Sequence, residues 1–377
     1  MTAAGDPAKR GSGGWVRLFV GSLNRESPYF QGARGKGIAV FAFDQETGAF
    51  SHLSNTTDID NPTYLVASEE SRTLYAVSEV YGWKEGTVSA YRFDLRSESL
   101  VYLNKQPTLG SLPAHLSLRN DGGQVFVANY AMAERGGPDQ SVAVFDVRPD
   151  GGLTPAVSSV AHVGSSINPA RQSRPHAHCI MPFGDTDIVL VTDLGVDTLF
   201  AYRVGNGGEL REVGRYTFEP GAGPRHIATD PASRRVFVIN ELNSTIAVLE
   251  LSATGSFEWL DEISAAPATP AARHHCAHII ATPDGRFLYS TDRARNIVSA
   301  FRVDSTGKLQ AIGHEPSGGI TPRHFAVSPN GRYLLVANQN SDNIAIFLRD
   351  EEAGSLRDTG ARIAVGTPMC VAFADIP

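Results

Sequence analysis

The sequence predicts an all-β fold, a seven-bladed β-propeller of four-stranded antiparallel blades. Three observations lead to this prediction. The 377-residue chain repeats one template about every 50 residues, each copy alternates short apolar segments with turn residues, and the last copy stops after one strand. A period of this size is typical of propellers, solenoids and arrays, and four short strands in about 50 residues form a propeller blade.

Each copy of the repeat can be located by its opening residue. The two clearest copies begin at Pro224 and Pro322, and each runs through an apolar segment to an asparagine, Asn240 or Asn338. The opening residues are, in chain order, Pro62, Pro113, Pro175, Pro224, Cys276, Pro322 and Pro368. Successive gaps are 51, 62, 49, 52, 46 and 46 residues.

The copy that starts at Pro224 illustrates the expected strands. Its predicted extended segments are 225–229, 236–240, 245–251 and 257–263. Turn residues separate them, and the segments are apolar or β-branched, which indicates strands. No segment shows sustained 3.6-residue periodicity, so few helices are expected.

The two ends of the chain are expected to share the closing blade. The copy at Pro368 contains one strand, 367–373, while 17–20 and 37–43 near the N-terminus resemble the second and third strands of a blade. A shared blade closes the ring and leaves no sheet edge exposed. We therefore expect a flexible tail over 1–14 and a single propeller domain over 15–377.

Composition excludes several classes of function. The net charge is −7 with no basic stripe, which argues against a nucleic-acid partner. No apolar segment reaches membrane length, and the N-terminal residues lack the apolar centre of a signal peptide. Cys179, Cys276 and Cys370 are too few and too scattered for a disulfide framework. These features favour a cytoplasmic protein with buried free thiols, and they say nothing about its oligomeric state.

Some positions recur in the repeat and indicate structural roles. Two residues after the opening residue come His115, His226, His278 and His324. Histidine is a common metal ligand, but we expect symmetric positions on different blades to lie too far apart to share one ion, and we predict no metal and no cofactor. A second recurring column, expected to hydrogen-bond the nearby backbone, is Ser78, Asn129, Asp193, Asn240, Asp292 and Asn338.

Two adjacent columns vary and are rich in charge. One residue after the opening residue the copies read Thr63, Ala114, His176, Arg225, Ala277, Arg323 and Met369. Directly after the Asx column they read Glu79, Tyr130, Leu194, Glu241, Arg293 and Gln339. In an antiparallel meander the start of strand one lies beside the end of strand two, so both columns should open on one mouth of the axial channel.

These phrases resemble the seven-bladed propeller lactonase family, which includes propeller-type 6-phosphogluconolactonase and carboxy-cis,cis-muconate cyclase. The resemblance covers about Arg17 to Phe373 and is carried by 174–176, 223–226, 240–244, 282–289 and 292–293, together with Gly21-Ser22, Gly37-Ile38 and Phe43-Asp44. It implies a catalytic group of His176, Arg225, Glu241 and Arg293. We add Arg323, Glu79, Tyr130 and Gln339 as candidate substrate-binding residues.

Residue chemistry and the resemblance together favour a lactonase acting on 6-phosphogluconolactone. Guanidinium groups bind carboxylate or phosphate and stabilise an oxyanion, and His176 or Glu241 can move protons. No GxSxG motif occurs, which favours direct, metal-independent attack of water on a small anionic lactone or carboxylate.

Two alternatives remain open at this point. The same four residues suit a lactonising cyclase of the carboxymuconate type, and a propeller can serve only as a binding scaffold. Two inserted segments, Ala131–Gln140 and His162–Arg174, can overhang the mouth and change the substrate, with Arg171 and Arg174 adding positive charge.

Overall fold

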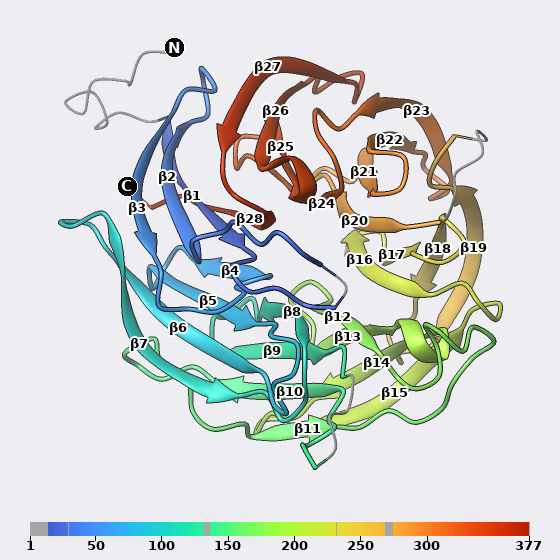
Figure 1. The fold of residues 1–377 in the computed structure, drawn as a ribbon. Coiled ribbons are helices and arrows are strands. Elements are labelled where there is room, and N and C mark those ends of the chain that lie inside the picture. The colour runs from blue at the N-terminus through green and yellow to red at the C-terminus, as the bar shows by residue number, and fades with distance from the viewer. Residues whose placement is uncertain (1–13, 29, 132–135, 231, 268–273, 377) are drawn as a thin grey trace.

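Seven four-stranded antiparallel sheets surround a central axis in the computed structural model, as the repeat predicts (Figure 1). The structure describes residues 14–28, 30–131, 136–230, 232–267 and 274–376; most of the predicted N-terminal tail, residues 1–13, lies outside these ranges. Helix within them is confined to two short 3-10 turns, η2 (Leu194–Val196) and η3 (Gln339–Ser341). No helix in this part of the chain is long and apolar enough to span a membrane.

Each blade runs outward from an axial first strand. The seven blades, each from inner to outer strand, are β28 (Pro368–Ala374), β1 (Trp15–Ser22), β2 (Ile38–Asp44) and β3 (Phe50–Thr56); β4 (Leu65–Ser68), β5 (Thr73–Ser78), β6 (Thr87–Asp94) and β7 (Ser99–Pro107); β8 (Pro113–Leu118), β9 (Gln124–Asn129), β10 (Val142–Asp146) and β11 (Ser158–Val160); β12 (Ala177–Pro182), β13 (Ile188–Asp193), β14 (Thr198–Val204) and β15 (Leu210–Thr217); β16 (Pro224–Asp230), β17 (Arg235–Asn240), β18 (Thr245–Leu251) and β19 (Phe257–Ser264); β20 (Cys276–Ala281), β21 (Phe287–Asp292), β22 (Ile297–Val303) and β23 (Leu309–Pro316); and β24 (Pro322–Val327), β25 (Tyr333–Asn338), β26 (Asn343–Arg349) and β27 (Leu356–Ala364). The four strands predicted for the copy at Pro224 agree with β16–β19 to within one or two residues.

The closing blade is built from both ends of the chain, which confirms the prediction. β28 pairs antiparallel with β1, from Arg17 opposite Ala374 to Gly21 opposite Cys370. β1 and β2 are the two strands expected near the N-terminus. Because β28 covers the inner edge of β1, the backbone groups of that edge are hydrogen-bonded and the ring is closed.

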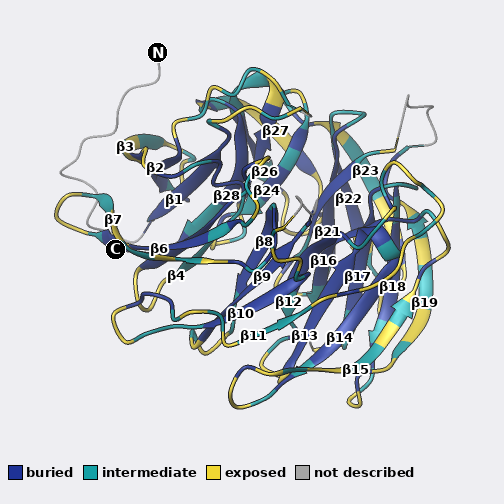
Figure 2. Cartoon of the chain, turned by 60° about the horizontal axis from the view of Figure 1, so that its bottom comes forward, coloured by how far each residue is buried: buried dark blue, intermediate teal, exposed yellow. Residues whose placement is uncertain are grey.

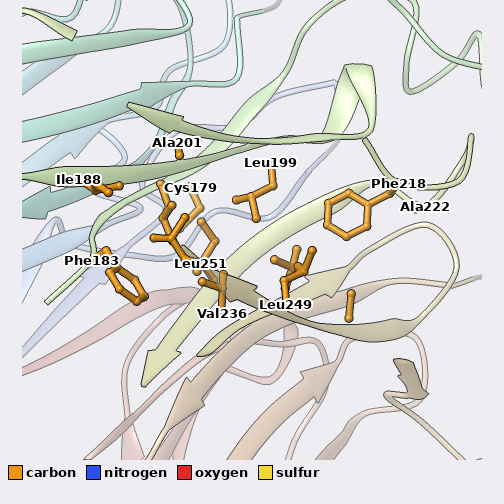
Figure 3. Close-up of a cluster of buried hydrophobic side chains, with 14 residues drawn as sticks. Cys179, Phe183, Ile188, Leu199, Ala201, Phe218, Ala222, Val236, Leu249 and Leu251 are labelled. Carbon is orange, nitrogen blue, oxygen red and sulfur yellow. The ribbon is translucent and has the colours of Figure 1, made fainter. Parts of the chain in front are cut away.

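The hydrophobic core lies between neighbouring blades. Figure 3 shows one such cluster, in which Cys179, Leu199 and Ala201 of one blade meet Val236 and Leu249 of the next. The inner three strands of each blade are largely buried, whereas outer strands such as β15 and β19 alternate toward solvent (Figure 2). A blade therefore cannot bury its own faces, and the ring must form as a whole.

The strand register corrects the alignment of one copy. Pro113, Pro224, Cys276 and Pro322 each pair with the Asx residue that ends the second strand of the same blade. In the third copy that partner is Ala177, opposite Asp193, and not Pro175. The prediction was wrong by two residues because Pro175-His176, which directly follows the insertion, resembles the opening phrase of a copy but precedes the strand. His178 therefore occupies the bulge position that Arg225 and Arg323 hold in their own blades.

The recurring histidines form one layer across the axis. His226 Nδ1 and His278 Nδ1 are 2.7 Å apart, the rings of His278 and His324 stack with centroids 3.9 Å apart, and the tilted rings of Tyr64 and His115 have centroids 4.1 Å apart. The expectation that these positions lie too far apart was wrong, because first strands converge closely at the axis. Within the described residues, no three His, Cys, Asp or Glu side chains are arranged to hold a metal ion.

The three cysteines are free and buried in first strands, as predicted. Burial raises the pKa of each thiol to about 12. They therefore remain protonated at neutral pH and act as small apolar side chains.

The histidine layer predicts a steep loss of stability in mild acid. Burial, then the neighbouring charge of His324 or Arg225, lowers the pKa of His115 and His324 from 6.5 to about 3. The unfolded chain binds protons below pH 6.5 and the folded chain does not. Each such histidine should therefore reduce the free energy of unfolding by about 1.4 kcal/mol per pH unit below pH 6.5, down to its folded pKa.

Urea unfolding between pH 7.0 and 5.0 tests this, with His115→Gln expected to flatten the slope by about one proton. The exposed His52 provides the control, since His52→Gln should leave the slope unchanged. A wild-type stability that is constant over this range would contradict the assignment.

Candidate active site

A buried carboxylate, Glu241, lies at the centre of the charged columns. It directly follows β17, and its side chain is only 2 % exposed. Oε2 accepts from Arg225 Nε at 2.9 Å and pairs with Arg293 Nη2 at 2.8 Å. Oε1 accepts from Arg171 Nη2 at 2.7 Å, with His275 Nε2 3.7 Å away. Three guanidinium groups thus meet on one carboxylate.

Backbone carbonyls at the start of β20 hold two of these arginines, Arg225 from the preceding blade and Arg293 from the same blade. Arg225 lies at the bulge of β16, and its Nη1 donates to Ala277 O at 2.5 Å. Arg293 follows β21, and its guanidinium donates to Cys276 O and His275 O. The carbonyls before and within β20 therefore fix both groups. A guanidinium has five N–H donors. The contacts made within the described part of the chain do not use all five in either arginine, so both can also donate to a ligand.

The charges in this group shift one another's pKa values. Burial alone would raise the pKa of Glu241, but Arg293, Arg171 and Arg225 hold it well below its usual range. Burial and the adjacent Arg293 lower the pKa of Arg225, and burial lowers that of Arg293 to about 10. At neutral pH the carboxylate is ionised and the guanidiniums are charged, so the group carries excess positive charge and favours an anion.

Tyr130 connects His176 to this group, because its ring stacks on His176 and its hydroxyl lies 3.4 Å from Arg171 Nη2. The two rings stack with centroids 4.2 Å apart and an angle of 14°. His176 Nδ1 is 2.7 Å from Tyr130 O, and because a carbonyl only accepts, Nδ1 carries the proton and Nε2 keeps a lone pair. Burial lowers the pKa of His176, so the imidazole is neutral at pH 7. Asp193 fixes the backbone by accepting from His176 N at 2.6 Å.

The backbone around His176 also depends on Gly195. A Cβ at Gly195 would lie 1.9 Å from Arg174 O and 2.8 Å from His176 N. Only glycine therefore permits the close approach that places His176 beside Tyr130.

His178 is a candidate that sequence reasoning missed. It is buried on the axis and contacts the rings of Tyr130 and His226, and among the described residues its Nδ1 has no hydrogen-bond partner. Burial, then the charge of Arg225, lowers its pKa well below 6.5. The constant 16-residue spacing between each opening residue and its Asx residue would have identified it, because that spacing places the opening residue at Ala177.

The other predicted site residues make their polar contacts with partners other than Glu241 within the described part of the chain. Arg323 lines an axial cavity with Arg225, and its Nη2 is 4.0 Å from Glu79 Oε2. Gln339 is buried with its backbone N–H donating to Thr321 O. No hydrogen bond or ion pair joins the Gln339 side chain to Glu241 or the arginines among the described residues.

The insertion at 162–174 was expected to overhang the mouth and add positive charge there. In the structure it also places Arg171 in direct contact with Glu241. Gln172 is fully buried and donates to Leu194 O and Asp197 Oδ1, while Ser166 donates to Asp197 Oδ2. Arg171 Nη2 also lies 3.4 Å from Tyr130 Oη. Arg174 turns away to Asp139 on the rim. In the other insertion, 131–140, residues 132–135 lie outside the described ranges.

One small cavity adjoins this group at Arg225. The axial cavity beside Arg225, Arg323 and Tyr64 has a volume of about 10 Å³, room for about one water molecule. A larger cleft of about 510 Å³ lies between the closing blade and β24–β27, near Arg34 and Phe41, and contains none of the predicted site residues. The charged group around Glu241 and the larger cleft therefore lie at different places in the ring.

Comparison with known proteins finds similarity over almost the whole chain. A family model described as "Lactonase, 7-bladed beta-propeller" matches residues 17–373. The chain is 33% identical to a 6-phosphogluconolactonase of Bacillus subtilis over 340 residues, covering 90% of this chain and 94% of the relative. It is 31% identical to a 6-phosphogluconolactonase of Formosa agariphila, covering 92% and 96%.

A solved structure, the periplasmic gluconolactonase of Pseudomonas aeruginosa, is also similar. It superposes with a TM-score of 0.86 at 32% identity, covering 96% of this chain and all of that one. The region that the family model matches, residues 17–373, includes strands from all seven blades and the residues around Glu241. The chain therefore belongs to the seven-bladed β-propeller lactonase family.

Proposed function

We propose that this protein is a lactonase that hydrolyses a sugar-type lactone, with 6-phosphogluconolactone as its substrate. The observation that carries the proposal is the meeting of three guanidiniums on the buried carboxylate of Glu241. Apolar residues of similar size could stabilise a propeller equally well at this position, so a buried charged group indicates a role other than stability. Membership of the lactonase family and the names of two relatives at 33% and 31% identity support the choice of substrate.

Arg225 and Arg293 are the proposed electrophilic groups. When water adds to the lactone carbonyl, negative charge develops on the carbonyl oxygen. Guanidinium N–H donors in a buried site stabilise such an oxyanion without rearranging at the moment of reaction. Glu241 holds both guanidiniums in place, and its negative charge offsets the free-energy cost of burying their positive charges. Because arginines supply this stabilisation, the proposed step uses no metal.

His176 is the proposed general base. A carboxylate that three cations hold ionised is a weak base, which disfavours Glu241. His176 is neutral and has its Nε2 lone pair free, because Nδ1–H is committed to Tyr130 O. It takes a proton from water as the oxygen bonds to the carbonyl carbon. The ring C–O bond then breaks, the leaving oxygen takes a proton, and lactone plus water become the open-chain acid.

We also infer a cytoplasmic location. The three free, buried thiols suit a reducing compartment, and a phosphorylated sugar lactone is an intracellular type of metabolite by its charge. The Pseudomonas relative is named as periplasmic, so location differs within the family or the substrate does.

Loss of the proposed electrophile should abolish most activity. Arg225→Lys keeps the charge but removes the planar fork, and kcat for 6-phosphogluconolactone should fall about 10²- to 10³-fold. Hydrolysis is followed by proton release and corrected for the spontaneous rate, with folding checked by circular dichroism. Wild-type protein that does not exceed the spontaneous rate would refute the substrate, and Arg225→Lys at wild-type activity would refute the site.

The pH profile should report the base. Since burial lowers the pKa of His176 below 6.5, kcat/KM should be constant near pH 7 and fall as the pH drops below the lowered pKa. His176→Gln should be slow at every pH and should lack this acid limb. Parallel profiles for the variant and the wild type, measured between pH 5 and 7, would assign the proton transfer to another group.

A further inference from the structure

The group around Glu241 is closed in this structure. The side chains of Arg225, Arg293 and Glu241 are only 2 %, 6 % and 2 % exposed, and the cavity that Arg225 lines with Arg323 holds about one water molecule. Some side chain must therefore move before substrate reaches the buried arginines. The structure shows which side chain is free to do so.

Arg171 is the most exposed member of the group. Its side chain is 34 % exposed, against 2 % for Arg225 and 6 % for Arg293. It alone among the three binds Oε1 of Glu241, so its departure leaves both contacts to Oε2 intact. Glu241 thus keeps two cations, and the buried arginines keep their partner.

The backbone that carries Arg171 is fixed. Ser166 N donates to Gln172 O, and Gln172 N donates to Asn168 O. The buried side chain of Gln172 is held by Leu194 O and Asp197. At the start of the insertion, buried His162 bridges Asp193 and Tyr202. The loop is therefore anchored on both sides of Arg171, and a change of partner requires only rotation of its side chain.

We propose that Arg171 is a specificity-determining gate. Its side chain moves away from Glu241 and binds the phosphate of the incoming lactone. The inference rests on the proposed function and deepens it. A phosphate carries close to two negative charges at pH 7, and it can replace the single carboxylate oxygen that Arg171 now holds. The exchange opens the mouth and anchors the substrate in one motion. Released Oε1 then accepts a hydrogen bond from a sugar hydroxyl.

A neutral lactone provides the matched comparison. Glucono-1,5-lactone has the same ring and no phosphate, so it offers Arg171 no replacement for Glu241. In the wild type we expect kcat/KM to favour the phosphorylated lactone. In Arg171→Ala it should fall about 10- to 100-fold for that substrate, mainly through KM, because a charged hydrogen bond is lost. For the neutral lactone it should stay within about threefold or rise, since the gate is gone.

Two further variants complete the kinetic test. For the phosphorylated lactone, the kcat/KM of Arg171→Lys should lie between those of the wild type and Arg171→Ala, because lysine keeps the charge but lacks the planar guanidinium fork. Arg357→Ala removes one exposed charge on β27 and should match the wild type on both lactones. Equal losses on both lactones in Arg171→Ala would overturn the gate and make Arg171 a general structural support.

Binding separates failure of the gate from failure of the proposed function. Calorimetric titration with 6-phosphogluconate and gluconate needs no turnover. The wild type should bind the phosphorylated acid at least about tenfold more tightly, and Arg171→Ala should lose that difference. If the difference survives in the variant, or if neither acid binds the wild type, the gate is wrong. If the difference is present and depends on Arg171 but no lactone is hydrolysed, only the proposed function fails.

Discussion

The site depends on one buried carboxylate that neutralises converging cations. Arg225 and Arg293 are almost fully buried, and each reaches Oε2 of Glu241 within 3 Å. Buried charges of one sign persist only with a partner of the other sign. Removing Glu241 would leave the guanidiniums to repel one another, at a cost of about 3–5 kcal/mol for a broken buried pair. The carboxylate thus makes possible the positive charge that binds an anion.

The propeller places this group by geometry that has nothing to do with charge. First strands converge on the axis, and the bulge near the start of most of them turns one side chain, such as Arg225 or Arg323, toward the channel. Beneath these side chains, neutral histidines and Tyr64 close the axis. Their lowered pKa values follow first from burial and then from nearby charge. The layer therefore adds no cation to a region already rich in them.

Repetition explains what the sequence could predict. Arg225, Glu241, Arg293 and Arg323 occupy repeat columns, so comparing copies was enough to bring them together. The third copy was misaligned because Pro175-His176 resembles an opening phrase two residues before the true opening position, Ala177, and His178 was missed as a result. The approach of the histidines was misjudged because a repeat specifies order around the axis but not the radius of the channel. Arg171 belongs to no column, so only the folded insertion reveals its contact with Glu241.

The most direct test of this account is the crystal structure of the protein with bound 6-phosphogluconate. We predict that the carboxylate of the ligand lies against Arg225 and Arg293, and that Arg171 has left Glu241 for the phosphate. Binding in the cleft of about 510 Å³ between the closing blade and β24–β27, with the group around Glu241 unchanged, would contradict it.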